Sequence, residues 1–391
     1  MTDGKCNEET NAGEMLSVNF DALTRYLDRT AERGIPGCDL VVTLGHEVIY
    51  RHMSGEREPG KPMRGDEVYV LYSATKLFTM VAGMQLIERG AVRLDDPVSK
   101  YLPEYADLTV LDGGEVRPAR TVMTVEHLMT MQGGLDYDTD SEPIRACLAK
   151  HGQAATTRQL AAAFVQKPLL FDPGTHFRYS LCHDVMAAVI EAASGLRFGE
   201  YLRRNVTEPL GMRCMGFSLS EAQLSRMASR YRWDAQERPV EEARTGNFCR
   251  ISEAHESGGG GLMGDVDSYI LLPEALANDG VGRSGARILT RASIDAMRKN
   301  RLTGDSRRDY DVLCEKRGYG YGLGVRTLTD PETSRSPVGE FGWDSAAGAW
   351  SMIDVDRRLA AFYAQHVLNC KRAYDEFHPA IRDLIYEGLE A

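Results

Sequence analysis

The chain has 391 residues, of which 43% are hydrophobic and 26% are charged. These proportions are typical of a folded globular protein of two or three domains, and they exclude a disordered chain or a collagen-like repeat. Asp and Glu (57) outnumber Lys and Arg (46), so the formal net charge is −11. A charge of this sign argues against nucleic acid or an anionic membrane as a partner.

Targeting segments and metal motifs are not evident in the sequence. The first 16 residues lack the basic and apolar regions of a secretory signal peptide. The eight cysteines are scattered without a C-x-x-C pair, so neither a zinc ribbon nor a redox motif is expected. No stretch reaches the roughly 18 apolar residues of a transmembrane helix. We therefore expect a cytoplasmic protein with reduced thiols, no metal and no cofactor.

Helices and strands are predicted along most of the chain, after a polar segment at residues 1–13 that we expect to be a disordered tail. Apolar residues recur at helical spacing over 20–33 and 73–88. Between them, 39–44 and 47–50 read as a β-hairpin, and 54–66 as a loop rich in Gly, Pro and charge. The remaining elements are helices at 124–131, 157–166, 184–194, 198–204, 265–277 and 291–300, strands at 319–328, 348–353 and 359–366, and a last helix at 373–388. Strands at both ends with helices between them indicate an α/β domain interrupted by a helical domain.

Two glycine motifs resemble nucleotide-binding loops but lack the required context. Residues 55–61 match G-x-x-x-x-G-K, yet Pro62 follows where a P-loop has Ser or Thr. Residues 259–264 match G-x-G-x-x-G, but the preceding residues 251–257 do not read as a buried strand. We expect the glycine run 258–261 to permit a close backbone approach in a loop.

The sequence Ser73-Ala-Thr-Lys76 opens the predicted helix at 73–88. A spacing of three places the hydroxyl and the amine on one helix face, about 5–6 Å apart at Cβ. A serine hydroxyl becomes a nucleophile when a neighbouring base activates it, and a helix N-terminus favours the oxyanion that forms. The motif alone leaves open an ordinary helix start with Ser73 as the cap.

Further segments strengthen the chemical interpretation because they follow in a familiar order. Residues 123–135 (MTVEHLMTMQGGL) and 171–181 (FDPGTHFRYSL) resemble "iTv-x-hLLtHtSGL" and "PG-x-x-F-x-YSN" of the serine β-lactamase and penicillin-binding protein superfamily. Other landmarks of that superfamily match 208–212, 259–263, 319–324 and 341–348. The chain looks most like the class C β-lactamase branch and, within it, the family VIII carboxylesterases.

The resemblance implies a β-lactamase/transpeptidase-like fold, in which an antiparallel sheet flanked by helices carries an inserted all-helical domain. On this basis residues 14–90 and 311–391 form a discontinuous α/β domain, and 91–310 form a mainly helical domain. The active site is expected where the two domains meet.

Two departures from true β-lactamases point towards neutral esters, and a third feature departs from the esterases themselves. Leu181 stands where their Y-x-N motif has asparagine, and Trp343 stands where their third motif has Lys or His. An indole offers an apolar wall and one N–H donor in place of a positive charge. Asp344 and Ser345 depart from the "W-G-G" of the esterases, which places an anion beside the pocket.

The family mechanism assigns roles to particular residues of this chain. Ser73 attacks the ester carbonyl to form an acyl-enzyme, with Lys76 and Tyr179 as the activating base pair. The N–H groups of Ser73 and Ala346 form the oxyanion hole. The residues expected to bind substrate are Trp343, Asp136, Tyr137, Leu181, Asp344 and Ser345.

The leading interpretation is therefore a serine carboxylesterase acting on small neutral esters. A D-amino-acid amidase or peptidase, or a weak β-lactamase, would use the same residues. A non-catalytic binding or scaffold protein is a third possibility, supported by Asp344 and Ser345 alone. His183 and Asp184 lie at a predicted helix start, where we expect Asp184 to cap the helix or to interact with its dipole.

Overall fold

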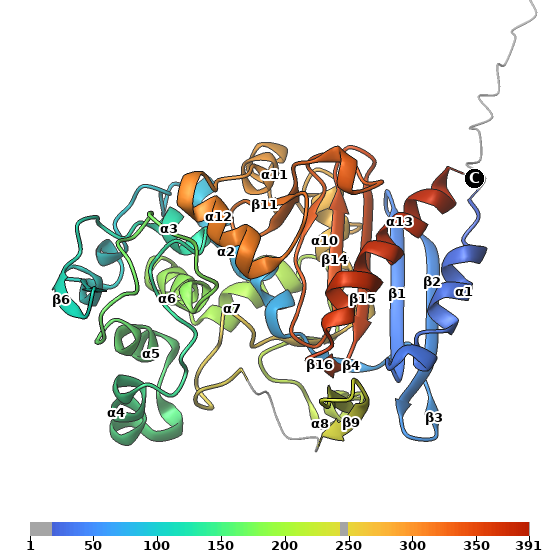
Figure 1. Ribbon diagram of the computed structural model, residues 1–391, viewed down its shortest axis with the longest axis horizontal. Coiled ribbons are helices and arrows are strands. Elements are labelled where there is room, and N and C mark those ends of the chain that lie inside the picture. The colour runs from blue at the N-terminus through green and yellow to red at the C-terminus, as the bar shows by residue number, and fades with distance from the viewer. Residues whose placement is uncertain (1–17, 243–248, 391) are drawn as a thin grey trace, which may run out of the picture.

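A computed structural model describes residues 18–242 and 249–390, so the predicted tail at 1–13 lies outside the described residues. The α-helices are α1 Asp21–Asp28, α2 Thr75–Glu88, α3 Val125–Met129, α4 Glu142–His151, α5 Thr157–Phe164, α6 Cys182–Ser194, α7 Phe198–Leu202, α8 Glu221–Leu224, α9 Val266–Tyr269, α10 Leu271–Ala277, α11 Arg291–Arg298, α12 Gly304–Cys314 and α13 His378–Leu389. The strands are β1 Gly37–Leu44, β2 Glu47–Glu58, β3 Lys61–Pro62, β4 Val68–Val70, β5 Thr109–Asp112, β6 Glu115–Pro118, β7 Met215–Gly216, β8 Arg230–Trp233, β9 Pro239–Glu242, β10 Met263–Asp265, β11 Tyr319–Tyr321, β12 Arg326–Leu328, β13 Phe341–Gly342, β14 Trp350–Asp354, β15 Leu359–Gln365 and β16 Val367–Leu368. The helical group and the main sheet lie side by side (Figure 1).

The main sheet has eight strands in the order β11-β12-β13-β14-β15-β1-β2-β3, and its neighbouring strands all pair antiparallel. Strand β1, near the N-terminus, pairs with β15, near the C-terminus, over seven residue pairs from Cys38↔Gln365 to Leu44↔Leu359. The two ends of the chain therefore build one sheet, and the expected antiparallel sheet with flanking helices is confirmed.

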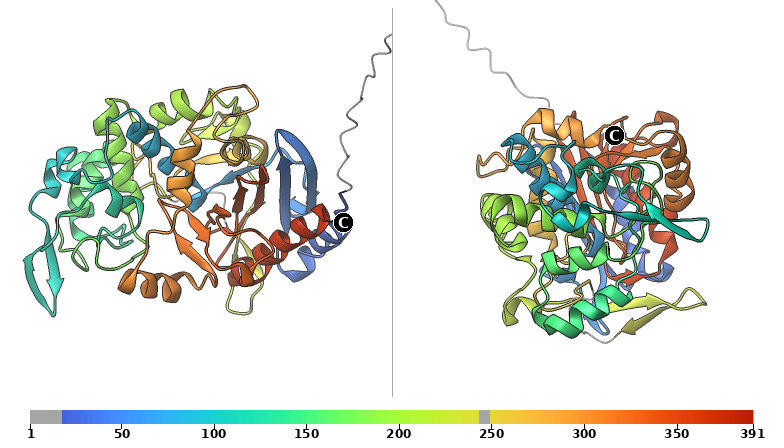
Figure 2. Two further views of the ribbon diagram at one scale, coloured as in Figure 1. Left: turned by 90° about the horizontal axis from the view of Figure 1, so that it is seen from above. Right: turned by 90° about the vertical axis from the view of Figure 1, so that its left-hand side faces the viewer.

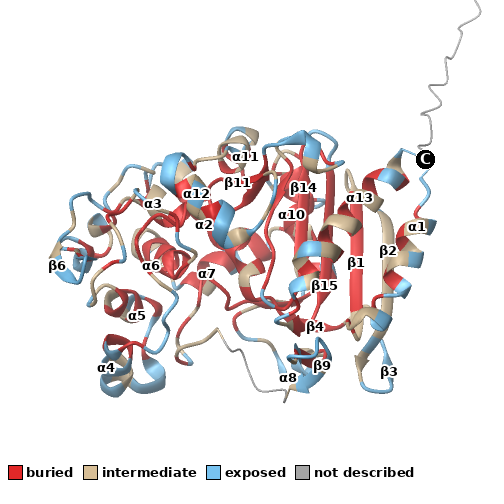
Figure 3. Ribbon diagram, viewed as in Figure 1, coloured by how far each residue is buried: buried red, intermediate tan, exposed pale blue. Residues whose placement is uncertain are grey.

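Helices cover both faces of this sheet, as the alternation along β15 shows. Leu359, Ala361 and Tyr363 belong to the apolar cluster shared with α1 and α13, whereas Ala360 and Phe362 belong to the larger cluster shared with α2, α9 and α10. Successive side chains of a strand point to opposite faces, so both sets are buried. Figure 3 shows β1, β14 and β15 buried along their lengths.

Helix α2 is buried almost all round, from Thr75 to Leu86, because it lies between the sheet and the helical group. A helix that is apolar on every side is expected in such a central position. It contacts α6 most extensively, and α6 in turn contacts α3 and α5. The N-terminal end of α2 is thereby fixed in the middle of the molecule.

The structure confirms the predicted hairpin (β1 and β2) and most of the predicted helices, but it changes three elements. The predicted loop 54–66 is largely strand, since β2 continues to Glu58 and turns at Gly60 into β3. The predicted helix 265–277 is two short helices, α9 and α10. The predicted strand 319–328 is the pair β11 and β12, because Gly324 adopts φ +76° in the turn between them.

Some elements had no prediction, among them α4, α12 and two hairpins, β5–β6 and β8–β9. The β5–β6 hairpin extends away from the helical group (Figure 2). Helices α9 and α10 pack on β1, β14 and β15 although they fall within 91–310, and the division into two domains stays a prediction. Within the described part of the chain, no helix is both long and apolar enough to cross a membrane.

Candidate active site

Ser73 lies on a tight turn between strand β4 and helix α2. The turn is the 3-10 segment Tyr72–Ala74, in which Tyr72 has φ +44°, a conformation that is rare for a bulky residue. Strained backbone of this kind concentrates at functional sites, where the surrounding structure holds it. The Ser73 side chain makes no capping hydrogen bond to the helix, so the turn presents its hydroxyl to other groups.

The structure brings Ser73, Lys76 and Tyr179 into direct contact. The Tyr179 hydroxyl donates to Ser73 Oγ at 2.7 Å, and Lys76 Nζ donates to the same oxygen at 3.2 Å. Lys76 Nζ also lies 4.6 Å from the centre of the Tyr179 ring. Two groups able to exchange protons are thus within hydrogen-bond reach of one hydroxyl, as nucleophilic catalysis requires.

Lys76 is fully buried, at 0% exposure, and its terminal nitrogen contacts the glycine loop. Its Nζ donates to the Gly259 carbonyl at 2.5 Å and to the Tyr137 hydroxyl at 3.5 Å. A Cβ on Gly259 would lie 2.4 Å from Asp184 Oδ2, and one on Gly258 would lie 2.3 Å from a backbone oxygen. The expected close approach is confirmed. Its purpose, to bring a carbonyl to the lysine, had no signal in the sequence.

The Tyr179 ring lies between two other aromatic rings. Tyr137 stacks on it with centroids 5.7 Å apart and planes 14° apart, and Trp343 stacks with a separation of 5.8 Å and an angle of 22°. Trp343 Nε1 also donates to the Tyr179 hydroxyl at 3.4 Å. The stack fixes the direction in which the Tyr179 hydroxyl points.

The segment after β13 brings Trp343 into contact with Tyr179 and continues through Asp344 to Ala346. Asp344 is buried and forms ion pairs with Lys316 and, at 3.6 Å, with Arg326. Burial raises the pKa of the Asp344 carboxyl, but the charges of Lys316 and Arg326 outweigh it and hold the pKa below its usual range. The carboxylate is therefore ionised and compensated within the protein.

The other residues expected at the site differ in what they contact. The Ser345 hydroxyl accepts the Ala349 N–H at 3.3 Å. Ala346 is exposed in the turn that follows, and no described residue accepts a hydrogen bond from its N–H. The Asp136 carboxylate pairs with Lys167 at 2.7 Å. Leu181 is 4% exposed in the apolar core, so its side chain contributes packing.

Asp184 lies in the first turn of α6, where its charge faces the positive end of the helix dipole as expected, but it does not cap the helix. Its side chain is 98% buried and accepts from the Ser257 hydroxyl at 2.5 Å, with His255 Nε2 at 3.6 Å. Burial lowers the pKa of His255. His183 is also fully buried, and burial together with the charge of Lys76 holds its pKa well below the usual range. Both imidazoles are therefore neutral at pH 7.

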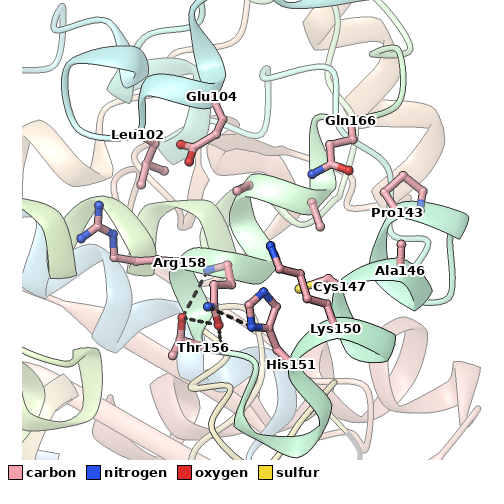
Figure 4. A pocket seen from close by; sticks show the side chains of 13 residues that line it. Leu102, Glu104, Pro143, Ala146, Cys147, Lys150, His151, Thr156, Arg158 and Gln166 are labelled. Atoms are coloured by element: carbon pink, nitrogen blue, oxygen red, sulfur yellow. Dashed lines mark hydrogen bonds between the residues drawn. The ribbon is translucent and has the colours of Figure 1, made fainter.

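A cavity of about 550 Å³ lies elsewhere, between α4, α5 and the turn Pro103–Tyr105 (Figure 4). Its lining includes Lys150, His151 and Arg158, and it contains none of the residues around Ser73. The chemistry-bearing groups therefore lie at the start of α2 and apart from this cavity.

Comparisons with known proteins agree with this geometry. The model of the Beta-lactamase family matches residues 20–376. Esterase EstB of Burkholderia gladioli is 32% identical over 95% of both chains, and Protein Rv1367c of Mycobacterium tuberculosis is 29% identical over 81% of both. The solved structure of EstCE1, a hydrolase with promiscuous acyltransferase activity, has a TM-score of 0.76 at 25% identity and covers 94% of this chain and 98% of its own. The expected superfamily is confirmed, and the chain belongs to the β-lactamase family.

Proposed function

We propose that this chain is a serine carboxylesterase that cleaves small neutral esters through an acyl-enzyme on Ser73. The observation that carries the proposal is the double contact at Ser73 Oγ, with Tyr179 at 2.7 Å and Lys76 at 3.2 Å. The esterase activity named for the relative EstB supports the ester as the substrate class.

Lys76 and Tyr179 act together as the base. The bond from Ser73 Oγ to the carbonyl carbon forms while the serine proton passes to this pair. The pair then returns a proton to the leaving alcohol as its C–O bond breaks. In the second half-reaction the pair takes a proton from water, whose oxygen attacks the acyl carbon. The bond between the acyl carbon and Ser73 Oγ then breaks, the pair returns the proton to Ser73 Oγ, and the acid is released. Positioned proton transfer of this kind contributes about 10²–10⁴-fold in rate.

The developing oxyanion is bound by the N–H groups of Ser73 and Ala346. Neither N–H has an acceptor among the described residues, so both are available to a substrate oxygen. Removing one such donor from a hydrolase typically costs about 10²–10³ in rate.

The preference for neutral esters follows from the third-motif segment. Trp343 is 5% exposed and stacks on Tyr179, so it presents an apolar surface where an anionic substrate would need a cation. The cations behind it, Lys316 and Arg326, are paired with Asp344. Tyr137, which is 42% exposed, also stacks on Tyr179, and Asp136 precedes it in the chain.

The test compares substrates against a nucleophile variant. Turnover of p-nitrophenyl acetate and butyrate is expected in the wild type and is expected to vanish in Ser73→Ala. Ser225→Ala, an exposed serine beyond helix α8, serves as the matched control and should retain full turnover. Faster cleavage of nitrocefin or of a D-amino-acid anilide than of the esters would show that the substrate is a β-lactam or an amide. Ester turnover that survives in Ser73→Ala would refute the proposal, and failure of a fluorophosphonate to label Ser73 would favour a non-catalytic protein.

A further inference from the structure

Four charged side chains form a cluster directly behind the third-motif segment. Arg326, Glu340 and Asp344 are 2%, 1% and 6% exposed, and Lys316 is half-buried at their edge. Lys316 pairs with Asp344, and Arg326 Nη1 lies 3.6 Å from Asp344 Oδ1. Arg326 Nη2 donates to Glu340 Oε1 at 3.1 Å. Two cations thus balance two anions.

The cluster joins four separate parts of the chain. Lys316 follows α12, Arg326 begins β12, Glu340 immediately precedes β13, and Asp344 lies two residues after its end. Arg326 also donates to the Ser351 carbonyl of β14 at 3.0 Å. The backbone of this segment also pairs with β14, through Phe341↔Ile353, the bridge Asp344↔Trp350 and the Ser351 N–H, which donates to the Trp343 carbonyl at 3.0 Å. The charges add to this pairing a connection to Lys316, which lies outside the strands.

Space behind the cluster makes these ionic contacts important. A cavity of about 470 Å³ is lined by Lys316, Arg326, Trp350, Tyr374 and His378, among others. The Lys316 side chain borders this cavity, so close packing does not hold it in place. Its attraction to the Asp344 carboxylate therefore determines where the two groups meet.

We propose that the pairing of Asp344 with Lys316 and Arg326 positions Trp343 and Ala346 for catalysis. The inference rests on the proposed function, because it assigns a task in that same site. Asp344 lies between the indole that stacks on Tyr179 and the N–H assigned to the oxyanion hole, so a shift at 344 moves both.

Removing a single charge unbalances the cluster, whereas removing a matched pair does not. Asp344→Asn leaves one excess buried positive charge, and Lys316→Met leaves one excess negative charge. A buried charge without its partner is costly, and moving towards water relieves it. Such a movement displaces the backbone at 343–346. The double variant leaves Arg326 with Glu340 and restores the balance.

The experiment is a double-mutant cycle on p-nitrophenyl butyrate, with active sites counted by fluorophosphonate titration. Each single variant should lower kcat at least about tenfold with KM within about threefold, since a displacement of 1 Å can cost 10²-fold. The double variant should recover to within about threefold of the wild type. Glu274→Gln is the matched control. It removes a buried carboxylate of helix α10 that pairs with Arg283, and it should leave kcat per active site unchanged.

The inference would be overturned if both single variants kept the wild-type kcat. It would also be overturned if the fold-decrease of kcat in the double variant equalled the product of the two single fold-decreases. If Asp344→Asn does not fold, Lys316→Met compared with Lys316→Arg carries the test, and only Lys316→Met should lose rate. The rate of fluorophosphonate labelling distinguishes failure of the proposed ester substrate from failure of the positioning role. A wild type that labels at Ser73 but cleaves no ester refutes the substrate class, and the labelling rates of the variants still decide the positioning role. An unreactive Ser73 refutes both.

Discussion

Tyr179→Phe should remove most of the turnover while leaving substrate affinity nearly intact. The change deletes the hydroxyl that lies 2.7 Å from Ser73 Oγ and keeps the ring between Tyr137 and Trp343. If this hydroxyl transfers the proton, kcat should fall about 10²–10⁴-fold, or about 3–5 kcal/mol in the barrier. The lost hydrogen bond should cost only about 0.5–1.5 kcal/mol in the free energy of unfolding.

The assay is steady-state hydrolysis of p-nitrophenyl butyrate at several pH values, with thermal unfolding measured on the same samples. A large fall in kcat, a KM within a few-fold of the wild type and a similar unfolding temperature would fit a residue acting in the transition state. A rise in KM with kcat unchanged would show that Tyr179 only binds substrate. A fall in kcat below about tenfold would leave Lys76 as the sole base, which contradicts the paired role proposed above.

Three further predictions test the surroundings of the site. Gly259→Ala places a Cβ 2.4 Å from Asp184 Oδ2, so it should lower the free energy of unfolding by about 1–3 kcal/mol and reduce kcat, measured by denaturant unfolding and ester assay. Trp343→Phe removes the indole N–H that donates to Tyr179 at 3.4 Å and should lower kcat about 2–10-fold; an unchanged kcat would refute that donor role. Burial lowers the pKa of His366 from 6.5 to about 4 in the folded protein. As the pH falls, the unfolded chain therefore takes up a proton at this histidine before the folded protein does. The neutral, buried imidazole then contributes about 3 kcal/mol to the free energy of unfolding above pH 6.5, and this contribution is lost between pH 6.5 and pH 4. Urea unfolding across that range should show a smaller loss for His366→Gln than for the wild type.

Elements with a clear hydrophobic period could be predicted from the sequence. The apolar run of β1 and the repeating apolar residues of α2 identify a strand and a helix because burial imposes those periods. The segment 265–277 was harder, since α9 and α10 follow one another with a single residue, Ile270, between them. Strand β3 was missed because its residues, Lys61 and Pro62, are polar or strand-breaking and lie exposed at the sheet edge.

Some residues of the candidate site could be predicted from the sequence, and others could not. Ser73, Lys76 and Tyr179 could be proposed together because their motifs follow in a family order, and the structure brings them into contact. The Gly259 carbonyl beside Lys76 could not be found, because a backbone oxygen 183 residues away leaves no pattern in side-chain types. Lys316 could not be assigned to Asp344 either, since an ion pair of this separation depends on the path of the sheet.

Asp344 shows how the structure changes the meaning of a sequence departure. In the sequence it placed an anion beside the pocket, and it was a main support for a non-catalytic protein. In the fold its charge is compensated by Lys316 and Arg326. The two cations nearest the third motif are thus bound within the protein, and Trp343 is the side chain that stacks on Tyr179. Neither of these two cations is free to bind a substrate carboxylate, so the departure at Asp344 agrees with the neutral-ester substrate proposed above.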